Sequence, residues 1–182
     1  MNYFTSDTHF GDTRLDLFHR DMLGLSPNQM DILIISKLSK LTKNDTLYHL
    51  GDVALSEQSL LYINNIKCKK VLIRGNYDQE DKINQDLLNE CFSEIYDELD
   101  ITIQGINFYL NHYPSKCKED KFNLTGHIHG LWRVQRNMIN VGCDIWHFEP
   151  VSEDKIIFTH TAIKKYYDEN VFAGELKCNN NI

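Results

Sequence analysis

The chain has 182 residues, of which 42% are hydrophobic and 25% charged, so it has the length of one domain and the composition of a globular rather than a disordered protein. Its apolar runs are shorter than the roughly 18 residues of a membrane span, and its first residues lack a signal-peptide layout, so we expect a cytoplasmic protein with no membrane partner. A formal net charge of −7 disfavours an extended nucleic-acid groove, because the field of the molecule repels polyanions.

The five cysteines are odd in number, widely spaced and free of any Cys-x-x-Cys pattern. This arrangement favours reduced thiols over a disulfide framework or a zinc ribbon. We expect a single domain over residues 1–173, followed by a loose C-terminal tail over residues 174–182.

Short apolar runs alternate with helical patterns in the first half of the chain, which is typical of an α/β sheet with crossover helices. Strands are predicted over residues 2–6, 46–50 and 70–74. Between the first two strands, Ser26 and Pro27 form a good helix start, and apolar residues follow at helical spacing from Met30 to Leu41. Two more helices are predicted over residues 57–66 and 79–91.

In the second half, apolar and polar residues alternate, which is typical of strands. Residues 101–110 predict a hairpin with Gly105 at its turn. Further strands are predicted over residues 122–125 and 138–141, and a C-terminal helix is predicted after Ser152.

Residues that can bind metal ions follow directly after the predicted strands in both halves of the chain. The carboxyl ends of neighbouring parallel strands meet at one edge of a sheet, so the loops that leave them can converge on a ligand. The segments are Asp7-Thr8-His9, Gly51-Asp52, Gly75-Asn76-Tyr77-Asp78, Asn111-His112 and Gly126-His127-Ile128-His129.

Each of these segments alone is ordinary, because Asp, Asn and Gly after a strand are usually turn formers. Together they supply two carboxylates, one amide and four imidazoles, which is too many ligands for one tetrahedral zinc ion and suits two cations that share a carboxylate. Two divalent ions would outweigh the two carboxylate charges, so the site would attract phosphate esters. A water between the ions would have its pKa lowered towards neutrality.

In these segments the sequence resembles the calcineurin-like metallophosphoesterases, whose pattern is D-x-H, G-D, G-N-H-D, H and G-H-x-H in this order. The resemblance covers residues 1 to 151 and is strongest with the small bacterial and phage members, which have segments similar to SDTHFG and NVGCDIWHFEPVS. It implies a four-layer α/β sandwich of two mixed β-sheets flanked by α-helices.

The resemblance also implies which residues hold each of two divalent ions. One ion would be held by Asp7, His9, Asp52 and His129, and the other by Asp52, Asn76, His112 and His127. Asp52 would bridge the ions, and Asn76 would also contact a phosphate oxygen of the substrate. Mn²⁺ is the metal we favour, and Fe, Ni, Zn and Co are alternatives that such ligands accept.

One position departs from the family pattern. The third residue of G-N-H-D is in much of the family a histidine that protonates the leaving oxygen, paired with the following Asp, and here it is Tyr77, followed by Asp78. A tyrosine, with a pKa of about 10, is a poorer proton donor at neutral pH than a histidine. We expect catalytic roles for Asp52, Asn76, Tyr77 and Asp78; alternatively, Tyr77 is a packing aromatic of the pocket wall.

Four other positions are candidates for the site. Three of them have both a functional and a structural interpretation, and the fourth has a structural one. Asp12 supports a ligand or is a solvated turn residue, of which we favour the second. Arg74 reaches phosphate or forms an ordinary ion pair, and residues 146–148 line a substrate cleft or belong to the core. Cys143 is expected to pack in the core.

The sequence thus predicts a dinuclear metal-dependent phosphoesterase that works by attack of a metal-bridging hydroxide. Its expected partner is a small phosphate ester, more readily a nucleotide-type phosphodiester. Two alternatives stay open, a phosphomonoesterase of protein or nucleotide phosphatase type and a non-catalytic metal-binding scaffold. The sequence carries no signal for an oligomeric state.

Overall fold

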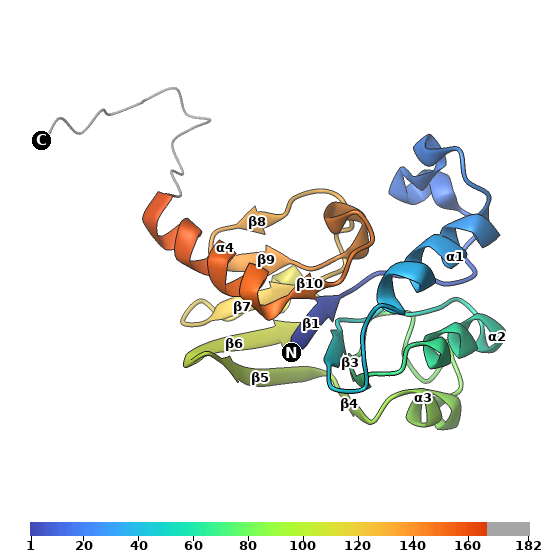
Figure 1. The fold of residues 1–182 in the computed structure, drawn as a ribbon, viewed down its shortest axis with the longest axis horizontal. Helices are drawn as coiled ribbons and strands as arrows, with labels where there is room; N and C mark the ends of the chain where they lie inside the picture. The colour runs from blue at the N-terminus through green and yellow to red at the C-terminus, as the bar shows by residue number, and fades with distance from the viewer. Residues whose placement is uncertain (167–182) are drawn as a thin grey trace, which may run out of the picture.

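A computed structural model describes residues 1–166, of which 164–166 are described by their backbone alone, so the predicted tail over residues 174–182 lies outside the described residues. Two five-stranded sheets form the centre of the molecule (Figure 1). The order in the first sheet is β10 (Val151–Ser152), β1 (Asn2–Thr5), β2 (Thr46–His49), β3 (Lys69–Ile73) and β4 (Glu94–Tyr96). The order in the second is β5 (Glu98–Ile103), β6 (Ile106–Asn111), β7 (Phe122–Thr125), β9 (Met138–Asn140) and β8 (Val134–Gln135).

Both sheets are mixed. In the first, β1 to β4 are parallel and β10 pairs antiparallel with β1. In the second, β6, β7 and β9 are parallel, and β5 and β8 pair antiparallel at the two edges. The α-helices of the described part are α1 (Pro27–Leu38), α2 (Glu57–Leu60), α3 (Gln85–Cys91) and α4 (Glu153–Tyr166). Short 3-10 helices are η1 (Leu15–Phe18), η2 (Arg20–Leu23), η3 (Leu61–Asn65), η4 (Pro114–Lys116) and η5 (Cys143–Trp146).

The helix starts follow from local capping. Ser26 and Gln29 form a capping box at the start of α1, with Pro27 in the first turn, as the sequence predicts. The helix predicted over 57–66 is instead the single turn α2 followed by the tighter η3. The helix predicted over 79–91 begins only at Gln85, because the Asn84 side chain accepts the backbone N–H groups of the first turn.

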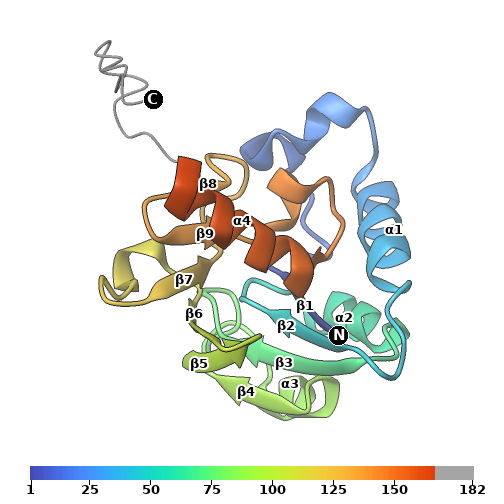
Figure 2. The ribbon, with the colours of Figure 1, turned by 60° about the vertical axis from the view of Figure 1, so that its left-hand side comes forward.

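Two hydrophobic cores lie on the two faces of the first sheet. On one face, Leu47 and Leu72 pack with apolar residues of the first three α-helices, such as Ile34, Leu60 and Leu88. The second core lies between the sheets, and its buried members include Phe4, Val71, Phe108, Leu124 and Ile139. The helices α1, α2 and α3 lie on one side of the first sheet and α4 on the other (Figure 2). The predicted sandwich of two mixed sheets with helices around them is confirmed.

No helix within residues 1–166 combines the length and the apolar character that crossing a bilayer requires. The cysteines in this part, Cys68, Cys91, Cys117 and Cys143, are free thiols as expected, and Cys178 lies outside it.

The two sheets are joined next to the carboxyl ends of their parallel strands. Ser6, directly after β1, forms a parallel bridge with Gly142, which follows β9. The backbone N–H of Cys143 donates to the Ser6 carbonyl over 2.9 Å. The loops after β1, β2 and β3 therefore face those after β6, β7 and β9.

Candidate metal centre

Two groups of metal-binding side chains lie at this junction. The first is Asp7, His9 and His129, and the second is Asp52, His112 and His127. Within each group the potential ligand atoms are within 4.8 Å of one another. Each group combines loops from both sheets, so the sandwich itself brings them together.

Asp52, a member of the second group, also lies next to the first group. Its Oδ2 is 3.5 Å from Nε2 of His9 and 3.5 Å from Nε2 of His112. Its Oδ1 accepts a hydrogen bond of 2.9 Å from the backbone N–H of Tyr77, which orients the carboxylate. This is the position that a carboxylate shared by two cations requires.

Asn76 joins the second group. Its Oδ1 lies 3.2 Å from Nε2 of His112 and 3.2 Å from Nδ1 of His127. The structure thus brings together all the predicted ligands, namely Asp7, His9, Asp52, Asn76, His112, His127 and His129.

The backbone at these ligands is unusual. Five of the predicted ligands have positive φ angles, from 47° to 73°: Asp7, His9, Asp52, His127 and His129. This left-handed conformation is uncommon outside glycine, and strained residues of this kind cluster at functional sites. Gly51, with φ of 89°, lies so close to the next strand-end loop that a Cβ would be 2.5 Å from the Gly75 nitrogen and 2.7 Å from Nδ1 of His112. The glycines of the motifs therefore allow the loops to approach one another.

The imidazoles have the character of metal ligands. Among the described residues, neither ring nitrogen of the buried His9 has a hydrogen-bond partner, and burial lowers the pKa of His9 to about 3. Buried polar atoms are rarely left unpaired, and an unprotonated imidazole is the form that binds a cation. For His112, Nδ1 lies 2.6 Å from the Leu50 carbonyl, so a proton there would leave Nε2 directed at the centre.

The carboxylates are buried deeply enough to need a counter-charge. Burial raises the pKa of Asp7, while the charges of His112 and His129 lower it less. For His112 burial acts in the opposite direction and would lower the pKa, but the neighbouring Asp52 and Asp7 raise it to about 9. A cation bound here would compensate the charges of Asp7 and Asp52 and displace the extra proton of His112. The donor set of carboxylate, amide and imidazole therefore fits divalent metal ions.

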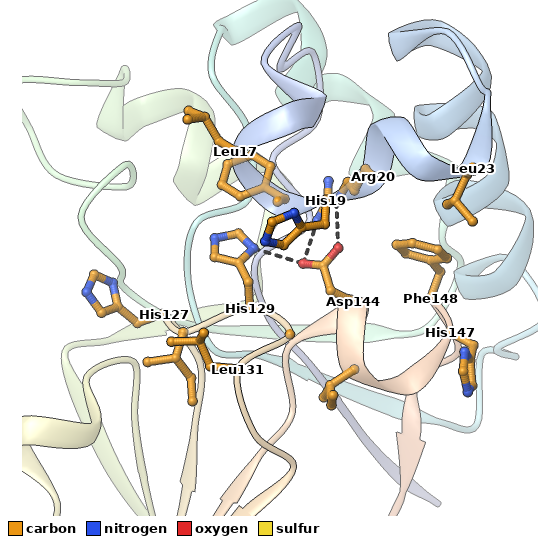
Figure 3. Close-up of a pocket in the computed structure, with 14 residues that line it drawn as sticks. Leu17, His19, Arg20, Leu23, His127, His129, Leu131, Asp144, His147 and Phe148 are labelled. Carbon is orange, nitrogen blue, oxygen red and sulfur yellow. Dashed lines mark hydrogen bonds and ion pairs between the residues drawn. The ribbon is translucent and has the colours of Figure 1, made fainter.

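Two residues outside the five strand-end segments support the centre, and one of them, Asp144, belongs to the segment NVGCDIWHFEPVS. The Asp144 Oδ2 lies 2.8 Å from Nδ1 of His129, and Arg20 donates to both oxygens of the same carboxylate over 2.6 and 3.1 Å (Figure 3). The Arg20 guanidinium, which is buried, also donates to the backbone carbonyls of Asp7 and Thr8. Arg20 and Asp144 therefore connect His129 to the loop that carries Asp7. Their 124-residue separation along the chain leaves no sequence signal for the pair.

Asp78 binds backbone groups of two strand-end loops, and its expected catalytic role stays a prediction. It is fully buried, and its two oxygens accept the backbone N–H groups of Asp52, Val53 and Gly75 over 2.7, 3.1 and 2.8 Å. It ties the loop after β2 to the loop after β3.

Tyr77 lies at the rim of the centre. Its ring is inclined by 78° to the His9 ring, with centroids 5.1 Å apart, and its hydroxyl accepts a hydrogen bond of 3.3 Å from Arg14. The preferred interpretation of Asp12 as a solvated turn residue is wrong. Asp12 is buried, its Oδ2 lies 4.0 Å from Nδ1 of His9, and both its oxygens accept hydrogen bonds from the Arg14 guanidinium.

Of the remaining candidates, some have a structural role and others lie beside the candidate centre. Arg74 forms an ion pair of 3.5 Å with Asp97. Trp146 packs against the core between the sheets, and His147 and Phe148 line a groove beside His129. Phe148 also packs against the core on the other face of the first sheet. Cys143 is buried, as predicted.

No protein-family model matches the chain, and no curated protein is significantly similar to it. Solved structures are similar. AQ665 from Aquifex aeolicus, a protein of unknown function, is 28% identical, with a TM-score of 0.68 over 87% of this chain and 98% of its own. This similarity shows a shared fold.

Two further structures are more distant, each with 19% identity over 78% of this chain. One is a novel archaeal phosphodiesterase, covered over 81% of its length with a TM-score of 0.47. The other is Yfce, a phosphoesterase from E. coli, covered over 77% with a TM-score of 0.42.

Proposed function

We propose that this protein is a metal-dependent phosphoesterase that holds two divalent ions and hydrolyses nucleotide-type phosphodiesters. Mn²⁺ is the metal we favour. The observation that carries the proposal is the position of Asp52, with Oδ2 at 3.5 Å from His9 of one candidate group and 3.5 Å from His112 of the other. The resemblance of the five strand-end motifs to the calcineurin-like metallophosphoesterases agrees with it.

The ions would be held by Asp7, His9, Asp52 and His129 on one side and by Asp52, Asn76, His112 and His127 on the other. When bound, such a pair neutralises the charge of the phosphate and makes water acidic enough to provide a nucleophile at neutral pH. The Asn76 oxygen faces His112 and His127, so its NH₂ group remains free to donate to a phosphate oxygen.

We assign Arg14 and Tyr77 to the side of the departing ester oxygen, because Tyr77 lies beside the His9 ring and Arg14 binds its hydroxyl. The Arg14 side chain is 44% exposed although Asp12 binds it on one side, so it can meet a phosphate oxygen from solvent. The Tyr77 hydroxyl accepts its hydrogen bond from Arg14 and therefore keeps its own proton to donate to the departing oxygen. We place proton donation at Tyr77, without help from Asp78.

The test is the hydrolysis of bis(p-nitrophenyl) phosphate with added Mn²⁺ by wild type and by Asp52→Asn. Loss of the shared carboxylate should lower turnover by at least roughly 100-fold. The matched control is Asp97→Asn, at a carboxylate that is 80% exposed, and it should retain wild-type turnover. Near wild-type turnover of Asp52→Asn would contradict the proposal, and metal binding without turnover in the wild type would favour the scaffold alternative.

A further inference from the structure

A groove with apolar walls leads away from the candidate metal centre. It has a volume of about 840 Å³ and begins at His127 and His129. Leu17 and Leu23, from η1 and η2, lie on one side of it and Leu131 on the opposite side (Figure 3). Its volume lies within the range of small-molecule pockets, roughly 300–1,000 Å³.

The apolar walls of the groove are open to solvent. Leu17, Leu23 and Leu131 are 59%, 49% and 79% exposed. Apolar side chains that gather in water around a cleft usually mark a binding site, because burying them against a ligand is favourable. Their position beside two proposed metal ligands indicates a substrate group rather than an unrelated partner.

Aromatic rings line the groove next to the metal ligands. The Phe18 ring stacks on His129, with centroids 4.1 Å apart and planes inclined by 15°. Phe148 lines the groove further from the centre and lies 5.8 Å from the Arg20 guanidinium (Figure 3). Rings favour other planar groups as neighbours.

The charged groups of the groove are already paired. Arg20 and Asp144 bind each other, and Asp144 also binds His129. Arg20 also donates to the backbone carbonyls of Asp7 and Thr8 and to the Cys143 sulfur. The groove thus offers no free buried charge for a second phosphate and suits an uncharged group.

We propose that this groove binds an aromatic or heteroaromatic ring carried by one ester group of the substrate. The inference rests on the proposed function, since a phosphate between His127 and His129 would direct an ester group along the groove. An aryl group and a nucleobase share the planar apolar faces that the walls require, and matched ligands separate the two sources.

The experiment measures ligand binding to the Mn²⁺-loaded protein by calorimetry, with two matched pairs. Phenylphosphonate is compared with methylphosphonate, and adenosine 5′-monophosphate with ribose 5-phosphate. We expect the ring-bearing member of at least one pair to bind tighter by roughly tenfold, because its ring leaves water for the groove. A difference in the first pair alone indicates an aryl ester, and a difference in the second indicates a nucleobase.

Leu131→Ser tests the location of the ring. Its side chain is 79% exposed, so the fold should tolerate the change, and the ratio of affinities within the responsive pair should fall at least threefold. The matched control is Leu61→Ser, at a leucine that is 46% exposed on η3 and outside the groove, and it should keep the wild-type ratio.

The outcomes separate the two proposals. If none of the four ligands binds although bis(p-nitrophenyl) phosphate is hydrolysed, the groove proposal is overturned; if there is neither binding nor hydrolysis, the phosphoesterase proposal fails. If all four bind but neither pair differs, or if Leu131→Ser keeps the wild-type ratio, phosphate binding stands and the groove proposal is overturned. The groove proposal would likewise be overturned if the wild type is a dimer, Leu131→Ser is a monomer and the ratio of affinities is unchanged. The groove would then be an interface between two copies of the chain.

Discussion

The Oδ2 atom of Asp144 lies 2.8 Å from Nδ1 of His129, so a carboxylate outside every strand-end motif holds a proposed metal ligand in place. A proton on Nδ1 is shared with this carboxylate, which leaves Nε2 for a cation on the side of Asp7. The Arg20 guanidinium fixes the carboxylate from behind.

Replacement of this carboxylate should weaken metal binding. Asp144→Asn removes the negative charge and leaves one acceptor oxygen where Arg20 and His129 now share two, so we expect the affinity for Mn²⁺ to fall by roughly 10–100-fold. Titration against a chelator of known affinity measures it, with Asp97→Asn as the control. Unchanged affinity in a folded Asp144→Asn protein would show that His129 needs no such support.

Tyr77→His should change substrate preference. A histidine has a pKa closer to neutrality and protonates a leaving oxygen more readily, so hydrolysis of p-nitrophenyl phosphate should rise relative to that of bis(p-nitrophenyl) phosphate. The ratio of the two kcat/KM values measures the effect, with Tyr62→His, at another partly buried tyrosine, for comparison. An unchanged ratio would remove the reason to prefer diesters.

Asp78→Ala separates a structural role from a catalytic one. The variant leaves the backbone N–H groups of Asp52, Val53 and Gly75 without their acceptor. Each buried donor left unsatisfied lowers the free energy of unfolding by about 1–3 kcal/mol. Thermal unfolding should therefore show a large fall in Tm. A normal Tm with a selective loss of kcat would restore the catalytic role that the sequence predicts.

Asp31 should make stability depend on pH. It is buried on α1, where its Oδ2 accepts the Gly11 N–H, and burial raises its pKa to about 6. The folded state thus holds this proton more tightly than the unfolded chain, so this group destabilises the fold as pH rises through 6. Asp31→Asn should be more stable than wild type at pH 7, and the difference should vanish near pH 4. Denaturant unfolding at both pH values measures this, and an equal difference at both would contradict it.

The sequence predicts the parts of the centre that follow local rules. Asp7, Asp52 and Asn76 come after apolar runs, and His112 and His127 come after alternating ones, so their place at strand ends can be read from the chain. Their convergence follows because both sheets direct parallel strands to one edge.

Other features depend on tertiary contacts that no local pattern carries. Asp12 looks like a turn residue, but it is buried because it lies between His9 and Arg14. β4 carries half-buried residues without clear alternation and forms only because it pairs with β3. The early part of the predicted helix over 79–91 does not form, because Asn84 provides a better start.

The most direct test of the central claim is the metal content of the protein reconstituted with Mn²⁺ and freed of excess ions. The account predicts two Mn²⁺ ions per wild-type chain and weakened occupancy of both sites in Asp52→Asn, because Asp52 contacts both candidate groups. Folded wild-type protein with only trace Mn²⁺, or an Asp52→Asn variant that keeps both ions at wild-type affinity, would contradict it.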